Sequence, residues 1–200
     1  MPGSRRILEV YVKSLTVLET GDRKVAEAQN ALVGLLIYPV PGRPEVLATT
    51  GLIPDLHDGE PLRFDPPRLF LKEFVQGPTG LLLTLTDRDD RNALVAFLRR
   101  LASVFAGSTG QALEHMLPGL LRSAFQEAVA SGRLVIGPGA EEKLQVVGVG
   151  SLPLLDPDRA AGVHAVPLIA PTNLARAGRP PIARGAANGQ VELELVVREP

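Results

Sequence analysis

The fold is indicated most directly by residues 81–105, which read LLLTLTDRDDRNALVAFLRRLASVF. The run LLLTLT at 81–86 is typical of a buried β-strand, and it stops at the acidic group Asp87-Arg88-Asp89-Asp90. From Asn92 onward, apolar residues recur every three or four positions, which is the period of a helix that buries one face. The chain therefore divides into a strand-rich first part, a helical middle and a strand-rich end.

Further strands are predicted where apolar and polar residues alternate or where a short apolar run is bounded by turn residues. They cover residues 7–18, 31–40, 46–50, 62–64, 69–75, 133–136, 143–155, 163–169 and 190–198. The linker QGPTG at 76–80 predicts that strands 69–75 and 81–86 form an antiparallel hairpin. Within 143–155, Gly148 and Gly150 predict a bulge or the close approach of another backbone.

These elements predict a mainly β fold with a helical insertion (α+β). Because strands do not alternate regularly with helices, we expect an antiparallel β-sandwich of about eight strands. A helical hairpin at about 90–131, interrupted at Pro118, would cover an end or an edge of it. The chain is expected to form a single domain over residues 1–200, with a long loop at 170–189 that is rich in Ala, Pro, Gly and Arg.

Composition excludes several kinds of partner. Aromatic residues make up only 4% of the chain and tryptophan is absent, so it lacks the stacking platforms that bind single-stranded nucleic acid. A formal charge of −1 provides no field to attract DNA or an anionic membrane. The absence of cysteine excludes disulfides and thiolate metal sites. No apolar run has the length of a signal peptide or of a bilayer span of roughly 20 residues, so we expect a cytoplasmic protein.

The acidic group at the strand-to-helix junction has two interpretations. Aspartates there cap the helix, because the unpaired N–H groups and the positive end of the helix dipole favour carboxylates. Alternatively, Asp87, Asp89 and Asp90 supply hard oxygen ligands for Ca²⁺.

The chain has a strand that ends in an Asp-x-Asp loop, TLTDRDD, and another loop aspartate, Asp22, after its N-terminal strand. This arrangement resembles the C2-type β-sandwich, which binds calcium and lipid. The resemblance covers about a third of the chain. It implies docking through loops at one end of the sandwich, with Asp22, Asp87, Asp89 and Asp90 as the metal ligands. It differs from that family in the helical segment that follows the acidic loop.

Two other groups of residues carry candidate chemistry. His57, with Asp55 or Asp58, forms a candidate acid–base pair, although a solvated turn is the alternative. Arg176, Arg179 and Arg184 form a candidate contact for an acidic partner, with solubilising loop charges as the alternative. The glycines of VGVGS at 147–151 lack the spacing of a phosphate-binding loop, and no GxSxG or HExxH motif occurs.

Balanced charge and the lack of catalytic signatures favour a non-enzymatic protein-interaction or assembly module, with no cofactor. Its partner would be another protein or a second copy, and apolar helix positions such as Leu94, Phe97 and Leu101 are candidate contacts. One alternative is a calcium-dependent membrane or protein adaptor that uses the acidic loop. The other is a hydrolase that uses the His57/Asp58 pair.

Overall fold

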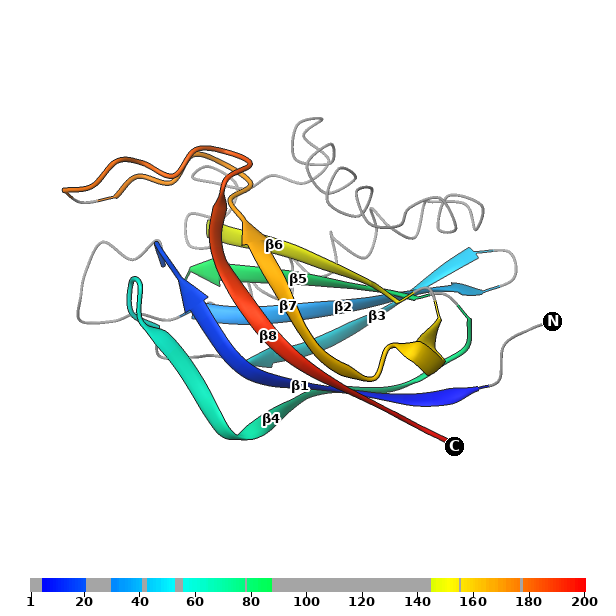
Figure 1. The fold of residues 1–200 in the computed structure, drawn as a ribbon. Coiled ribbons are helices and arrows are strands. Elements are labelled where there is room, and N and C mark those ends of the chain that lie inside the picture. The colour runs from blue at the N-terminus through cyan, green and yellow to red at the C-terminus, as the bar shows by residue number, and fades with distance from the viewer. Residues whose placement is uncertain are drawn as a thin grey trace.

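The computed structural model describes residues 5–20, 30–40, 43–52, 56–77, 79–87, 145–154, 156–176 and 178–200. In these residues the chain forms strands and one short 3-10 helix (Figure 1). The elements are β1 (Arg6–Val17), β2 (Asn30–Val40), β3 (Arg43–Leu52), β4 (Pro61–Val75), β5 (Thr79–Asp87), β6 (Gln145–Leu154), η1 (Pro157–Arg159), β7 (Gly162–Ile169) and β8 (Ala187–Arg198).

The strands form one antiparallel sheet in the order β3-β2-β5-β6-β7-β8-β1-β4. The sheet curls into a nearly closed ring, in which β8 and β7 cross in front of β2 and β5 in Figure 1. The predicted antiparallel, mainly β architecture of about eight strands is confirmed. The predicted division into two sheets is wrong, because β6 and β7 are joined and make the sheet continuous.

The ring has two weak junctions. β6 and β7 share a single residue pair, Val149 with Ile169, whereas the other neighbouring strands pair over most of their length. At the other junction, the outer strands β3 and β4 approach each other but are not neighbours in the hydrogen-bonded order. The sheet therefore consists of two well-paired halves, β3-β2-β5-β6 and β7-β8-β1-β4.

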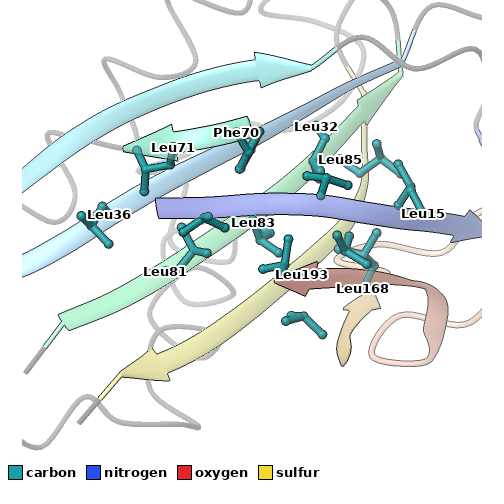
Figure 2. Packing of buried hydrophobic residues seen from close by; sticks show 14 of the residues in the cluster. Leu15, Leu32, Leu36, Phe70, Leu71, Leu81, Leu83, Leu85, Leu168 and Leu193 are labelled. Atoms are coloured by element: carbon teal, nitrogen blue, oxygen red, sulfur yellow. The ribbon is translucent and has the colours of Figure 1, made fainter. Parts of the chain in front are cut away.

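Alternation along β1 and β8 directs apolar side chains into the ring. In β1, Leu8, Val10 and Val12 are fully buried, and a register shift between Val12 and Ser14 returns Leu15 to the same side. In β8, the inward side chains are Val191, Leu193 and Leu195, as their two-residue period predicts. These positions join the leucines of β2 and β5 in one core (Figure 2).

Among the described residues, Phe70 is the bulkiest fully buried side chain. It comes from β4 and packs on Gly34 of β2, where an added Cβ would lie 2.6 Å from the Phe70 Cε1 atom. A side chain at position 34 would occupy the space that the ring fills. Gly34 thus allows an aromatic residue from one half of the sheet to pack against the backbone of the other half.

The predicted hairpin between 69–75 and 81–86 is wrong. β4 pairs with β1, whereas β5 pairs with β2 and β6. The linker does turn the chain, with Gly77 at a φ of 77°, but it carries the chain from one half of the sheet to the other. The segment 61–75, predicted as two short strands and a loop, is one continuous strand because β1 pairs along both of its parts.

The structure confirms both the bulge and the close approach of another backbone that were predicted at Gly148 and Gly150. Leu85 pairs with Gly148 but Thr86 pairs with Val146, so Val147 is an extra residue in β6. An added Cβ at Gly150 would lie 2.8 Å from the carbonyl oxygen of Pro167 in β7. Glycine at these positions lets β6 and β7 approach closely at their one pairing point.

The predicted loop at 170–189 is only partly a loop. Leu174 and Ile182 form a two-hydrogen-bond bridge that folds this segment into a narrow ribbon, and β8 already begins at Ala187 (Figure 1). The predicted helical hairpin at 90–131 and the strand at 133–136 lie outside the described residues. Within the described part of the chain, no helix is long and apolar enough to cross a membrane.

Candidate functional site

The outward side of β4, β1, β8 and β7 forms one continuous surface, called here the outer face. Its side chains lie in rows that follow the strand register. The rows are Phe74–Ile7–Arg198, Lys72–Glu9–Val196, Leu69–Tyr11–Glu194–Val163 and Arg63–Ser14–Glu192. Because outward positions of an antiparallel sheet are usually polar, the apolar members of these rows distinguish the face from an ordinary solvated surface.

A charged network occupies the middle of the outer face. The carboxylate of Glu9 is 2.7 Å from the Lys72 Nζ atom and 3.2 Å from the Arg198 Nε atom, and it accepts a 3.0 Å hydrogen bond from the Tyr11 hydroxyl. Glu9 is only 5% exposed, while the side chains of Lys72 and Arg198 are more than half exposed. One buried carboxylate therefore holds three larger side chains from three adjacent strands in fixed positions.

The network shifts the ionisation of its members. The hydrogen bond from Lys72 lowers the pKa of Glu9 below 4.5, against the opposing effect of burial, with further lowering by Tyr11 and Arg198. The hydrogen bond that Tyr11 donates to Glu9 raises the pKa of Tyr11 above 10.0, and burial adds to this effect. At neutral pH, Glu9 is thus an anion and Tyr11 a neutral donor.

We expect Glu9→Gln to lower the midpoint of thermal unfolding at pH 7, because two cations lose their shared anion. The stability that Glu9 contributes is complete above pH 4.5 and is lost as pH falls through the lower pKa of the folded state. The difference in unfolding midpoint between the variant and the wild type should therefore be largest at neutral pH and vanish in acid. Circular dichroism melts between pH 3 and pH 7 measure it, with Glu60→Gln in an exposed turn as the control; a difference that persists at low pH would contradict the assignment.

Apolar side chains on the outer face remain exposed around this network. Val163 is 55% exposed, Leu69 47% and Phe74 45%. The guanidinium of Arg5 lies 4.2 Å from the centroid of the Phe74 ring, within the range of a cation–π contact. The face thus combines exposed apolar groups with charges held in place, a composition typical of protein-binding surfaces.

The acidic residues predicted as metal ligands are not brought together in the described part of the chain. Asp22, Asp89 and Asp90 lie outside it, and Asp87 is the last residue of β5. No group of three or more potential metal-ligating side chains occurs among the described residues. The backbone does bring the relevant segments to one end of the sheet, because Asn30 pairs with Asp87 and donates a 3.0 Å hydrogen bond to the Thr20 carbonyl. Calcium binding stays a prediction.

The predicted acid–base pair lies in an exposed turn. His57 and Asp58 are both exposed, and Asp55 lies outside the described residues. The carboxylate of Asp58 accepts a 2.9 Å hydrogen bond from the Thr20 N–H, and the Glu60 N–H donates to the His57 carbonyl at 3.1 Å. These contacts give Asp58 a structural part in joining the turn to the segment after β1.

The structure also contains a buried polar cluster that the sequence did not indicate. Asn188 is fully buried; its Oδ1 accepts from the Glu19 N–H at 3.0 Å, and its Nδ2 donates to the carbonyls of Glu19 and Val147 at 2.8 Å each. The residues AANGQ at 186–190 have turn character, so sequence reasoning placed Asn188 in a loop. The nearby Arg176 donates to the Leu18 carbonyl at 3.3 Å and pairs with Glu19. Of the three predicted partner-binding arginines, Arg176 is thus mainly a structural residue.

Sequence reasoning also missed the network on the outer face. It placed Glu9 and Tyr11 on the polar side of a strand, which is correct, but it could not pair them with Lys72 and Arg198 on strands far along the chain. The signal in the sequence that could have indicated the network was the single glutamate between Leu8 and Val10.

No protein-family model matches the sequence, and a search of curated proteins finds none that is significantly similar to it.

Proposed function

We propose that this protein is a non-enzymatic interaction and assembly module that binds another protein through its outer face. The observation that carries the proposal is the ordered network of Glu9, Lys72, Arg198 and Tyr11 surrounded by exposed Leu69, Phe74 and Val163. Exposed apolar side chains beside ordered polar groups are typical of protein-binding surfaces, and tyrosine and arginine are enriched among the residues that dominate binding energy.

The network favours binding because its side chains are already ordered. Fixing a long side chain such as lysine or arginine at an interface costs about 0.5–1.5 kcal/mol of conformational entropy. Glu9 already holds Lys72 and Arg198, from the strands on either side, in the free protein. Part of this entropy cost is therefore incurred when the protein folds and not when it binds. A partner then meets a surface whose polar groups need little rearrangement.

The helical hairpin expected at 90–131 belongs to the same proposal. Its apolar stripe, which includes Leu94, Phe97 and Leu101, would supply either core packing or a second contact surface of the module.

The test places the photo-cross-linking amino acid p-benzoylphenylalanine at Phe74 and, as a matched control, at Leu18. Leu18 is also apolar and 41% exposed, but it follows the end of β1 and belongs to none of the rows that define the outer face. We expect cross-links from position 74, and not from position 18, to one defined protein identified by mass spectrometry. That protein, once purified, should bind the wild type at least about tenfold more tightly than Phe74→Ala, as for a residue that dominates an interface.

Equal cross-linking from positions 74 and 18 would sink the proposal, and so would an affinity of the purified partner that Phe74→Ala and Leu69→Ala leave unchanged. Circular dichroism of each variant shows whether it is folded, so that a loss of binding is not confused with unfolding.

A further inference from the structure

The outward side of β2, β5 and β6, called here the back face, is apolar like the interior of the ring. Side chains along these strands alternate, and Leu32, Leu83 and Leu85 belong to the core inside the ring, so their neighbours along the chain point away from it. The rows of the back face are Ala31–Thr86–Val146, Val33–Thr84–Val149 and Leu35–Leu82–Ser151. This part of the sheet therefore has two apolar sides.

The back face is buried, although none of the described strands, nor η1, lies over it. Apart from Ser151, its side chains are at most 3% exposed, whereas the apolar residues of the outer face named above are 45–55% exposed. The described elements in substantial contact with β2, β5 and β6 are strands close to them in the sheet order, and β4, whose Phe70 reaches Gly34 through the interior. Another part of the chain must therefore supply the layer that covers the back face.

The composition of the back face indicates what kind of layer fits it. Its side chains are Ala, Val, Leu, Thr and Ser, and none of them is charged. The Thr86 hydroxyl already donates a 3.2 Å hydrogen bond to the Ala31 carbonyl, so its burial does not leave the donor unpaired. An apolar cover thus satisfies this face without supplying hydrogen bonds to Thr86.

Residues 88–144 are the part of the chain best placed to supply that cover. They connect β5 to β6, and because Asp87 pairs with Gln145, the connection leaves from and returns to the same end of the back face. The next longest stretch outside the described residues is 21–29. It reads GDRKVAEAQ and has no apolar stripe.

We propose that residues 92–105 dock on the back face as an amphipathic helix. The residues 88–91 keep the start of this helix within about 14 Å of Asp87. A helix about 10 Å in diameter covers three strands that lie about 4.8 Å apart. The apolar stripe that meets the back face consists of Leu94, Phe97, Leu98, Leu101 and Phe105.

This docking assigns the apolar stripe to the protein's own packing, so contacts with a partner are left to the outer face. The inference does not rest on the proposed function, because the back face and the outer face belong to different halves of the sheet.

The test measures how fast single cysteines react with dithionitrobenzoate in the full chain, which has no native cysteine. Val33→Cys, in the middle row of the back face, should react at least about 100-fold more slowly than Val163→Cys on the outer face, because a covered thiol reacts only when its cover opens. Phe97→Asp places a charge in the apolar stripe and should speed the labelling of Val33→Cys at least about tenfold. Leu101→Ala, a milder change in the stripe, should speed it in the same direction.

Two controls separate this opening from other causes. Arg99→Asp introduces the same side chain on the opposite side of the predicted helix and should leave the labelling of Val33→Cys unchanged. Val10→Cys, inside the ring, should stay protected in both stripe variants, which shows that the ring remains folded. Protection of Val33→Cys should not change when the protein is diluted, since the cover belongs to the same chain.

The inference is overturned if Val33→Cys reacts as fast as Val163→Cys, if neither stripe variant speeds its labelling, or if Arg99→Asp speeds it equally. Protection that is lost on dilution would assign the cover to a second copy and also overturn it. If both stripe variants expose positions 33 and 10 together, residues 92–105 belong to the core of the ring and the inference fails. None of these results affects cross-linking from position 74, so a failure of the proposed function is recognised separately.

Discussion

Phe70→Ala is expected to lower the free energy of unfolding by about 3–5 kcal/mol, the usual cost of removing a fully buried aromatic side chain. The ring is 1% exposed and fills the core between β4 and β2. β3 and β4 are not joined in the hydrogen-bonded order of the sheet, so β4 depends on apolar contacts such as that of Phe70 with Gly34 of β2 to stay attached to the other half of the sheet. Chemical denaturation followed by circular dichroism measures the change.

Phe74→Ala is the matched control, because Phe74 lies on the same strand but points outward and is 45% exposed. It should cost less than about 1 kcal/mol, in line with substitutions away from the core. A loss for Phe70→Ala as small as that of Phe74→Ala would show that Phe70 does not hold β4 against β2.

A double-mutant cycle with Gly34 tests the contact itself. Gly34→Ala should destabilise by about 1–3 kcal/mol, because the new methyl group overlaps the Phe70 ring. In a Phe70→Leu background the same change should cost much less, since the overlapping ring atoms are gone. The two changes would then be coupled, as expected for residues in contact. Without the clash, alanine within a strand would give at least the stability of glycine. A loss of stability in Gly34→Ala would therefore indicate the overlap with the Phe70 ring.

Asn188→Ala is expected to cost about 3 kcal/mol or more. The change leaves the Glu19 N–H and the carbonyls of Glu19 and Val147 without this partner inside the protein. Each buried polar group that loses its hydrogen bond costs about 1–3 kcal/mol. Because Asn188 is on β8 and Val147 on β6, its side chain also links the two halves of the sheet near the single β6–β7 pair.

Asn173→Ala provides the comparison for Asn188→Ala. Asn173 also accepts a hydrogen bond from a backbone N–H, that of Arg184 at 2.8 Å, but at an exposed site where water can replace it. Its loss should cost less than about 1 kcal/mol. Equal effects of the two substitutions, measured by chemical denaturation, would contradict the part assigned to Asn188.

Side chains thus link the two halves of the sheet at two places. Phe70 of β4 packs on Gly34 of β2, and Asn188 of β8 donates a hydrogen bond to the Val147 carbonyl of β6. Neither residue was a candidate for this part from the sequence. Phe70 lay in the predicted strand 69–75, and Asn188 was assigned to the loop at 170–189.

The sequence by itself determined the local elements. The alternation in β1 and β8, the buried runs of β2 and β5 and the glycines of β6 each predicted the observed structure, because the direction of a side chain along a strand depends on the backbone of that strand alone. Only the tertiary structure decided which strands are neighbours. Pairing depends on contacts between residues far apart in the chain, so the predicted β4–β5 hairpin was wrong, and the continuous sheet replaced the two-sheet sandwich. For the same reason the outer face emerged only when β1, β4 and β8 came together, and with them Glu9, Lys72 and Arg198.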